Sequence, residues 1–229
     1  MSTQFSDREF LSAYEGQQPR RVPGYHAMHR MAAVLIAEHA PHDAQVLVLG
    51  AGGGLEIKAF AEANPGWSFD GVDPSADMLE LAEHTLGPLA DRARLTCGLI
   101  DDAPSGPFDA AASILTLQFL DPGERSRTVA EVRRRLKPGA PFVVAHFGFP
   151  HQNLEDRSHW LSRYVEFAVA SGVAREDAEA ARLAIDEHLH ILTPDEDQAI
   201  LRDAGFTNIT EFYTALTFRG WVCYVDESD

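Results

Sequence analysis

The chain has 229 residues, of which 45% are hydrophobic and 24% are charged. This length allows one sizeable buried core, so we expect a single domain spanning residues 1–229. No stretch reaches the roughly 18 apolar residues that a membrane helix needs, which argues against a membrane protein. The 35 acidic and 19 basic residues give a formal net charge of −16, and such a surface repels nucleic-acid backbones.

The densest basic run, Arg133 to Arg135 with Lys137, falls at the end of a predicted helix, where cations offset the carbonyl end of the helix dipole. We therefore interpret it as a helix terminus and expect no nucleic-acid partner. Cys97 and Cys223 have no metal or redox spacing, and the first residues lack the pattern of a secretory signal. These features favour a cytoplasmic protein with a small-molecule substrate, and they leave a homodimer open.

Apolar runs alternate with helical periodicity from about residue 45 to residue 147, which predicts an α/β protein with a doubly wound parallel sheet. Two later β-rich runs are separated by too little chain for a crossover and predict an antiparallel hairpin at the sheet edge. The expected strands are residues 45–50, 67–73, 94–97, 109–115, 141–147, 208–215 and 217–225. The expected helices include residues 55–63, a helix capped by Ser75, and residues 123–136 and 195–204.

Two segments flank this core pattern. Residues 1–40 predict an N-terminal arm and an amphipathic helix, with Met28, Met31, Ala32 and Leu35 facing the core. Residues 152–190 are helical and acidic and contain no strand candidate, so we expect a helical insertion over the carboxyl edge of the sheet. Open α/β sheets bind their ligands at that edge.

A glycine-rich turn follows the first buried strand, with Gly50, Gly52 and Gly54 in a G-x-G-x-G pattern. Glycines allow the backbone to approach a ligand closely. A dinucleotide fingerprint needs a small residue at the sixth position, but that position is Leu55, which disfavours NAD. S-adenosylmethionine (SAM) has no pyrophosphate, and its ribose and amino-acid end can pack against such a turn.

An acid at the end of the second strand supports the same interpretation. Asp73 stands where a carboxylate can accept hydrogen bonds from both ribose hydroxyls, although an acid before Pro74 can also simply begin a turn. Asp101 follows the third strand, where an acid can hold an adenine amino group or merely form a solvated turn. The candidate cofactor contacts in these segments are Gly50, Ala51, Gly52, Gly54, Asp73, Pro74, Met78, Ile100, Asp101 and Ile114.

The segments VLVLGAGGG, GVD, FDAAASILTLQFL, RRRLKPGAPFVVAHF, LRDAGF and FRGWVCY together resemble the class I SAM-dependent methyltransferases. The resemblance spans about residues 20 to 226. It implies a Rossmann-like sheet of seven strands in the order 3-2-1-4-5-7-6, with the seventh strand antiparallel. One departure is Val48, which stands where many members carry an acid two residues before the first glycine.

A closer similarity is to the carboxy-S-adenosylmethionine synthases, which carboxylate SAM. It rests on Val22 to Tyr25 and on Thr116 to Leu120 with the following Pro122, Glu124 and Arg125. The resemblance implies that Tyr25 contacts the cofactor and that Arg182 pairs with the added carboxylate, so SAM or carboxy-SAM is the expected cofactor.

The match to the synthases departs at two positions. Ile114 replaces the family's asparagine, and Leu99 replaces its acid after the third strand. A methyltransferase acting on a small molecule is therefore the leading hypothesis. A synthase-like enzyme, a non-catalytic SAM-binding module and, less favoured, an NAD-binding oxidoreductase are the alternatives.

Methyl transfer requires alignment of the acceptor more than a dedicated base. If the acceptor must lose a proton, His146 and His151 at the end of the fifth strand are the candidate catalytic residues. The same two residues with Glu155 could also be proposed as a metal site, but no second cluster supports it, and we expect no metal.

Overall fold

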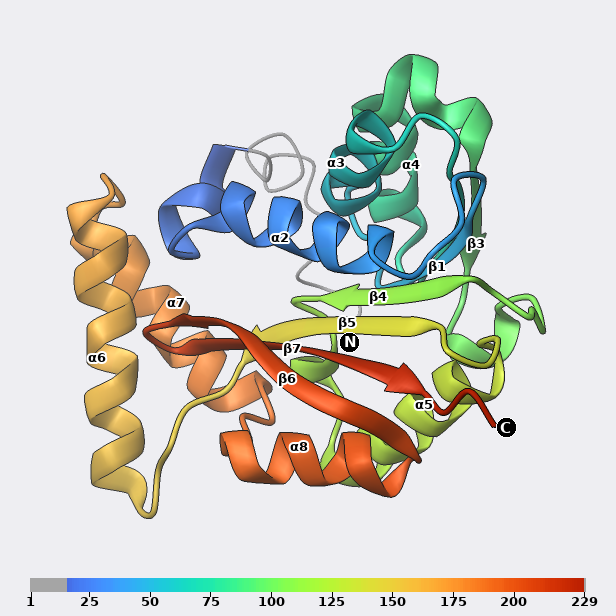
Figure 1. Ribbon diagram of the computed structural model, residues 1–229. Helices are drawn as coiled ribbons and strands as arrows, with labels where there is room; N and C mark the ends of the chain where they lie inside the picture. Colours follow the sequence, from blue (N-terminus) through green and yellow to red (C-terminus); the bar gives the residue numbers. More distant parts are fainter. Residues whose placement is uncertain (1–15, 229) are drawn as a thin grey trace.

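A seven-stranded sheet forms the centre of the molecule, in the order β3-β2-β1-β4-β5-β7-β6 (Figure 1). The computed structural model describes residues 16–228. The strands β1 to β5 pair in parallel, whereas β7 is antiparallel to both β5 and β6. The strands are β1 Gln45–Leu49, β2 Ser68–Asp73, β3 Ala93–Cys97, β4 Ala110–Ile114, β5 Pro141–Phe147, β6 Phe206–Ala215 and β7 Phe218–Val225.

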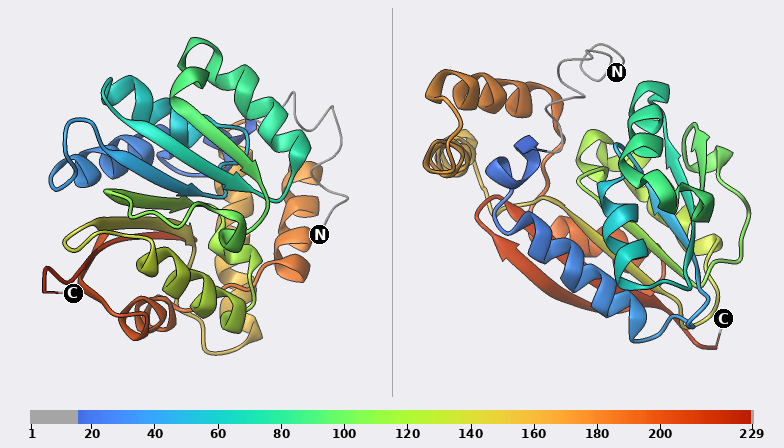
Figure 2. Two further views of the ribbon diagram at one scale, coloured as in Figure 1. Left: turned by 90° about the vertical axis from the view of Figure 1, so that its right-hand side faces the viewer. Right: turned by 90° about the horizontal axis from the view of Figure 1, so that it is seen from above.

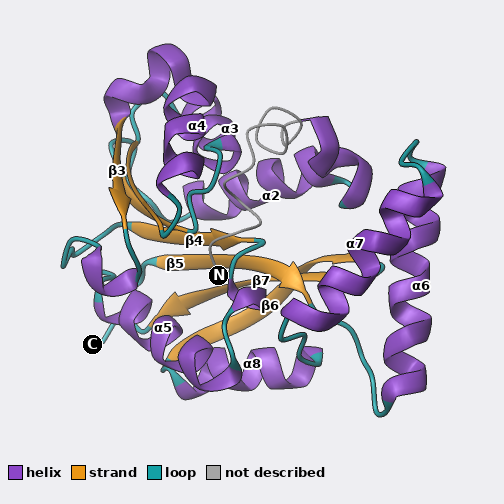
Figure 3. Cartoon of the chain, turned by 180° about the vertical axis from the view of Figure 1, so that it is seen from behind, coloured by secondary structure: helices purple, strands orange, loops and turns teal. Residues whose placement is uncertain are grey.

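Helices cover both faces of this sheet and its carboxyl edge (Figures 1 and 2). One face packs against α2 Tyr25–Ala37, α3 Leu55–Ala63 and α4 Ala76–Leu86, and the other against α5 Pro122–Arg134 and α8 Pro194–Asp203. Two long helices, α6 Leu154–Ala170 and α7 Arg175–His188, lie beyond the carboxyl ends of β4 and β5, as the view from behind in Figure 3 also shows. Short 3-10 helices occupy η1 Gly87–Arg92, η2 Ile100–Asp102 and η3 Leu117–Phe119.

The side chains along a strand point alternately into two hydrophobic clusters, because successive side chains point to opposite faces of a sheet. In β1, Val46 and Val48 face the cluster under α2 and α3, and Leu47 and Leu49 face the cluster under α5 and α8. All four are buried. This explains why the sequence of β1 is continuously apolar rather than alternating.

The predicted topology is confirmed, including the antiparallel seventh strand and the helical segment after β5. Ser75 caps α4 as expected, accepting a hydrogen bond from the Met78 N–H. One expectation for α2 is wrong: Met28 is buried, but Met31 is 37% exposed. The predicted N-terminal arm lies largely outside the described residues. Within residues 16–228, no helix combines the length and apolarity needed to cross a bilayer.

A buried ion pair joins the two helices on one face of the sheet. Arg125 of α5 donates to Asp197 of α8 at 2.6 Å, and the two side chains are only 1% and 2% exposed. The Arg125 guanidinium also donates to the His190 carbonyl, and Nε2 of His146 lies 3.1 Å from the Asp197 carboxylate. Burial opposes ionisation of Asp197, but its contacts with His146 and Arg125 outweigh burial and lower its pKa.

Arg125→Met should therefore destabilise the protein strongly, because it leaves the buried Asp197 carboxylate without its cation. Loss of one partner of a buried pair costs about 3–5 kcal/mol. Thermal unfolding monitored by circular dichroism should show a drop in Tm of roughly 10 °C.

The matched control is Arg127→Met on the same helix. Arg127 pairs with Asp101 and Glu124, and the side chains of the three residues are 41%, 59% and 53% exposed. An exposed pair contributes about 1 kcal/mol or less. Equal effects of the two substitutions would contradict the role assigned to Arg125.

Candidate cofactor site

The site begins with the turn between β1 and α3. Gly50 and Gly54 have φ values of 77° and 79°, in the left-handed region that favours glycine. A Cβ atom on Gly50 would lie 1.9 Å from the Thr116 hydroxyl oxygen, and one on Gly54 would lie 2.9 Å from the Ala82 Cα. The turn is thus pressed against both the segment after β4 and helix α4, and larger residues at these two positions would displace it.

Asp73 ties this turn to the end of β2. Its Oδ2 accepts the Gly52 N–H at 2.9 Å, and its Oδ1 accepts the Ser75 N–H at 2.9 Å. Burial raises the pKa of the Asp73 carboxyl, and these two hydrogen bonds act against that rise. Each carboxylate oxygen can accept more than one hydrogen bond, so capacity remains for ligand hydroxyls.

The chain after β4 closes the other side of the turn. Leu115 adopts φ 60°, which is uncommon for a residue with a side chain, and its N–H donates to the Ala145 carbonyl of β5 at 2.6 Å. Gln118 then accepts the Phe147 N–H at 3.0 Å through its side chain. These contacts hold the ends of β4 and β5 together beside the glycine turn. Gln118 belongs to the motif Thr116 to Leu120, but the motif alone predicts no role for it.

A buried polar atom at the glycine turn indicates that the site fits a ligand. Oε1 of Glu56, in the first turn of α3, has no hydrogen-bond partner among residues 16–228. Buried polar groups are normally satisfied, so an orphaned carboxylate oxygen next to a glycine turn is consistent with an external donor. SAM carries both ribose hydroxyls for Asp73 and an ammonium donor.

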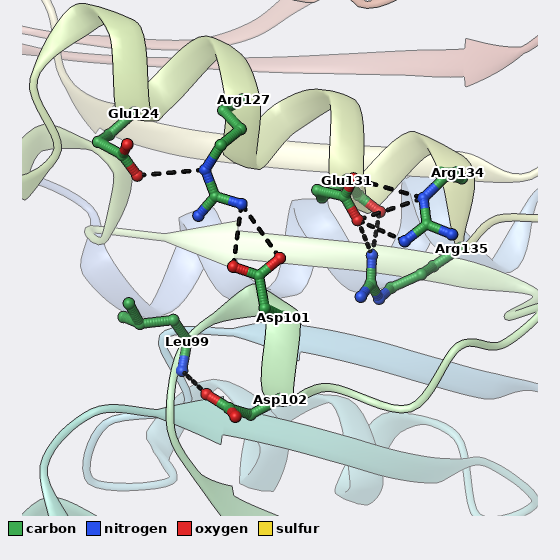
Figure 4. Close-up of polar contacts among 8 residues, drawn as sticks. All are labelled: Leu99, Asp101, Asp102, Glu124, Arg127, Glu131, Arg134 and Arg135. Atoms are coloured by element: carbon green, nitrogen blue, oxygen red, sulfur yellow. Dashed lines mark hydrogen bonds and ion pairs between the residues drawn. The ribbon is translucent and has the colours of Figure 1, made fainter.

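The predicted contacts after β2, β3 and β4 lie at the same edge of the sheet. Met78, Ile100 and Ile114 are buried there, and Pro74 is exposed. The Asp101 carboxylate instead pairs with Arg127 of α5 at 2.9 Å and 3.1 Å, as Figure 4 shows. In this arrangement Asp101 is engaged by α5, while Asp102 accepts the Leu99 N–H.

Cations of the basic run at the end of α5 form ion pairs with acidic residues of the fold. Arg134 and Arg135 both pair with Glu131, at 2.6 Å and 2.5 Å (Figure 4). Lys137 pairs with Asp109 at 2.6 Å. The run ends the helix, as the sequence analysis expected.

The two contacts implied by the synthase resemblance lie in different settings. Tyr25 begins α2, is buried, and packs its ring 4.4 Å from that of His29. The preceding Pro23 carbonyl accepts a hydrogen bond from Tyr213 of β6, which anchors this segment to the sheet. Arg182 pairs with Glu179 at 2.8 Å on its own helix α7.

The two candidate bases also differ. His146 is 2% exposed and belongs to the Arg125–Asp197 cluster on the α5 and α8 face. His151 is partly exposed in the loop between β5 and α6, with its Nδ1 3.0 Å from the Phe149 carbonyl. Its ring lies 5.4 Å from that of Phe149, which stacks on Trp160. No group of three potential metal ligands gathers anywhere in residues 16–228.

Comparison with known proteins agrees with this geometry. Residues 47–142 match the methyltransferase domain family. The chain is 28% identical over 226 residues to the carboxy-S-adenosyl-L-methionine synthase of Chromohalobacter salexigens, covering 96% of this chain and 83% of that one. It is similar in structure to an O-methyltransferase family protein from Burkholderia thailandensis, with a TM-score of 0.70, 14% identity and coverage of 98% of this chain.

A second structural relative is a putative O-methyltransferase from Nostoc punctiforme, with a TM-score of 0.66, 19% identity and coverage of 94% of this chain. The chain spans 59% of the Nostoc protein and 62% of the Burkholderia protein, so these two relatives bear on the fold.

The sheet order, the glycine turn and the family match define a class I SAM-dependent methyltransferase fold. Along most of its length the sequence is similar to carboxy-SAM synthases. The fold and this similarity together support SAM as the cofactor or substrate.

Asp73→Asn should weaken SAM binding, because the amide NH₂ would face the N–H of either Gly52 or Ser75 and could not accept from a ribose hydroxyl. A lost hydrogen bond to a charged group costs about 1.5–3 kcal/mol, so the Kd measured by calorimetry should rise about 10- to 100-fold. Asp77→Asn, an exposed position in the first turn of α4, is the control. An unchanged Kd for Asp73→Asn would show that this carboxylate does not hold the ribose.

Proposed function

We propose that the protein transfers the methyl group of SAM to a small-molecule acceptor. The observation that carries this proposal is the glycine turn fastened to Asp73, which provides a nucleoside site at the carboxyl edge of a methyltransferase sheet. When bound, SAM supplies an electrophilic methyl carbon, and transfer leaves its sulfur as a neutral thioether.

Two features support a small acceptor. The net charge is −16. In the densest basic run, Arg134 and Arg135 pair with Glu131, Lys137 pairs with Asp109, and Arg133 donates to the Gly205 carbonyl. The helices α6 and α7 lie beyond the carboxyl ends of β4 and β5, over the edge of the sheet that carries the glycine turn (Figure 1). Such a cover suits a small ligand that is enclosed during the reaction.

His151 is the stronger of the two candidate bases. If its Nδ1–H donates to the Phe149 carbonyl, Nε2 is left as the acceptor and can take a proton from an acceptor hydroxyl or amine. His146 is buried against Asp197 on the opposite face of the sheet, where it contributes to the contact between α5 and α8. We therefore assign the base role to His151 and a structural role to His146.

A second candidate function is formation of carboxy-SAM. The similarity to synthases over 96% of the chain favours it, as does the buried Tyr25. Against it stand Ile114 and Leu99 at two positions where the synthases carry polar groups, and the pairing of Arg182 with Glu179. These differences lead us to prefer methyl transfer.

Mass spectrometry of the ligand retained during purification tests the two functions directly. We expect the mass of SAM or of S-adenosylhomocysteine, and label from methyl-labelled SAM should appear in a small molecule of a cell extract. Asp73→Asn protein should retain less ligand and serves as the control. A retained ligand with the mass of carboxy-SAM would contradict methyl transfer and support the second function.

A further inference from the structure

Glu56 occupies an unusual position for an acidic residue in a helix. It lies in the first turn of α3, two residues after Gly54, and is 5% exposed. Acidic residues in a first turn are normally exposed, where the helix dipole favours them without loss of hydration. Burial of a carboxyl removes that hydration, so a purely structural role for Glu56 would require buried partners.

The partners of Glu56 in the described chain are few. The backbone of Ile114, at the end of β4, hydrogen-bonds to the carboxyl, and Oε1 has no partner among residues 16–228. No charged side chain is among the influences on this group. Burial is the largest of those influences and raises the pKa of Glu56 well above its usual range. Among residues 16–228, no donor therefore satisfies Oε1 of Glu56.

The order of the strands indicates which part of SAM would meet Glu56. The turn after β1 lies between the end of β2, which carries Asp73, and the end of β4, which carries Ile114. With the ribose at Asp73, the base and the amino-acid chain leave the sugar in opposite directions along this edge. The β3 side offers the buried, apolar Ile100, which suits a base, and the β4 side offers the Glu56 carboxyl, which suits an ammonium group.

Within residues 16–228, the contacts identified on the β4 side of the turn include no other acid for that ammonium group. Val48 and Ile114 are apolar, and Asp73 lies at the end of β2, where its remaining acceptor capacity is assigned to the ribose hydroxyls. A charge-assisted hydrogen bond to an ammonium group would satisfy Oε1 and offset the cost of burying the carboxylate.

We propose that Glu56 binds the ammonium group on the amino-acid end of SAM. This proposal rests on the assignment of SAM as the ligand and is independent of the acceptor and of the group transferred. It applies equally to methyl transfer and to carboxy-SAM formation, because both use the same amino-acid end.

The decisive experiment compares two neutral thioethers that differ in the amino-acid group: S-adenosylhomocysteine and 5′-methylthioadenosine, which lacks it. Glu56→Gln preserves the shape of the side chain and removes its charge. Calorimetry should show that S-adenosylhomocysteine binds about 10- to 100-fold more weakly to Glu56→Gln than to wild type. The affinity for 5′-methylthioadenosine should stay within about twofold. Glu62→Gln, exposed on the same helix, is the matched control and should change neither affinity.

The outcomes separate this proposal from the cofactor assignment. Unchanged binding of S-adenosylhomocysteine by Glu56→Gln would overturn the role of Glu56, and so would an equal loss of both ligands, which would indicate a structural effect on the turn. Failure of the wild type to bind either ligand would instead remove the SAM assignment on which the proposal rests.

Proton release on wild-type protein keeps the test available if Glu56→Gln does not fold. Titrations at about pH 6.5, where an amino group remains protonated, are run in two buffers with different heats of ionisation. S-adenosylhomocysteine should displace more protons than 5′-methylthioadenosine, since only the first ligand brings a cation to Glu56. Asp73 is the other carboxyl at the turn with a raised pKa. It faces the ribose in both ligands, so its contribution to proton release is the same in the two titrations. Equal proton release would contradict the proposal.

Discussion

The hydrogen bond from the Gly52 N–H to the Asp73 carboxylate joins the first two βα units at the carboxyl edge of the sheet. It fixes the glycine turn relative to β2, while Thr116 presses on the turn from the β4 side and Ala82 from α4. Parallel strands end at a common edge, so these three segments meet although they are far apart in sequence. The candidate contacts to SAM at the glycine turn and at the ends of β2 and β4 depend on that convergence, including the orphaned oxygen of Glu56.

The face of the sheet under α5 and α8 contributes to the stability of the fold. Arg125, Asp197 and His146 form a buried polar cluster that connects α5 to α8. Through the His190 carbonyl, Arg125 also holds the chain just after α7, and Gln118 links that same segment to the end of β4. The cover formed by α6 and α7 is thus anchored at its C-terminal end to the scaffold. Because the face under α5 and α8 is stabilised in this way, the carboxyl edge of the sheet can bind a ligand without being reorganised.

The sequence predicts the strands well because β1, β4 and β5 are short apolar runs between turn signals, and β3 and β5 each match to within one residue. The sequence predicts less well which side of a helix faces the core. The stripe expected on α2 included Met31, whereas the helix buries His29 and Ala33 instead. Size and apolarity suggested Met31, but contact with neighbouring elements decides which side of a helix faces inward.

His146 and Glu56 illustrate two limits of sequence reasoning about sites. All seven residues of β5 are buried, so the strand shows no alternation that would reveal toward which face His146 points. The glycine pattern correctly located the turn, but an acid just after it reads as an ordinary complement to the helix dipole. Only the burial of Glu56 and its orphaned oxygen distinguish it, and both depend on the end of β4, more than fifty residues away.

The most direct test of the central claim is a crystal structure of the protein grown with S-adenosylhomocysteine. The account predicts that both ribose hydroxyls lie within hydrogen-bonding distance of the Asp73 carboxylate and that the glycine turn contacts the sugar. A nucleoside bound elsewhere, or ribose hydroxyls directed away from Asp73, would contradict it.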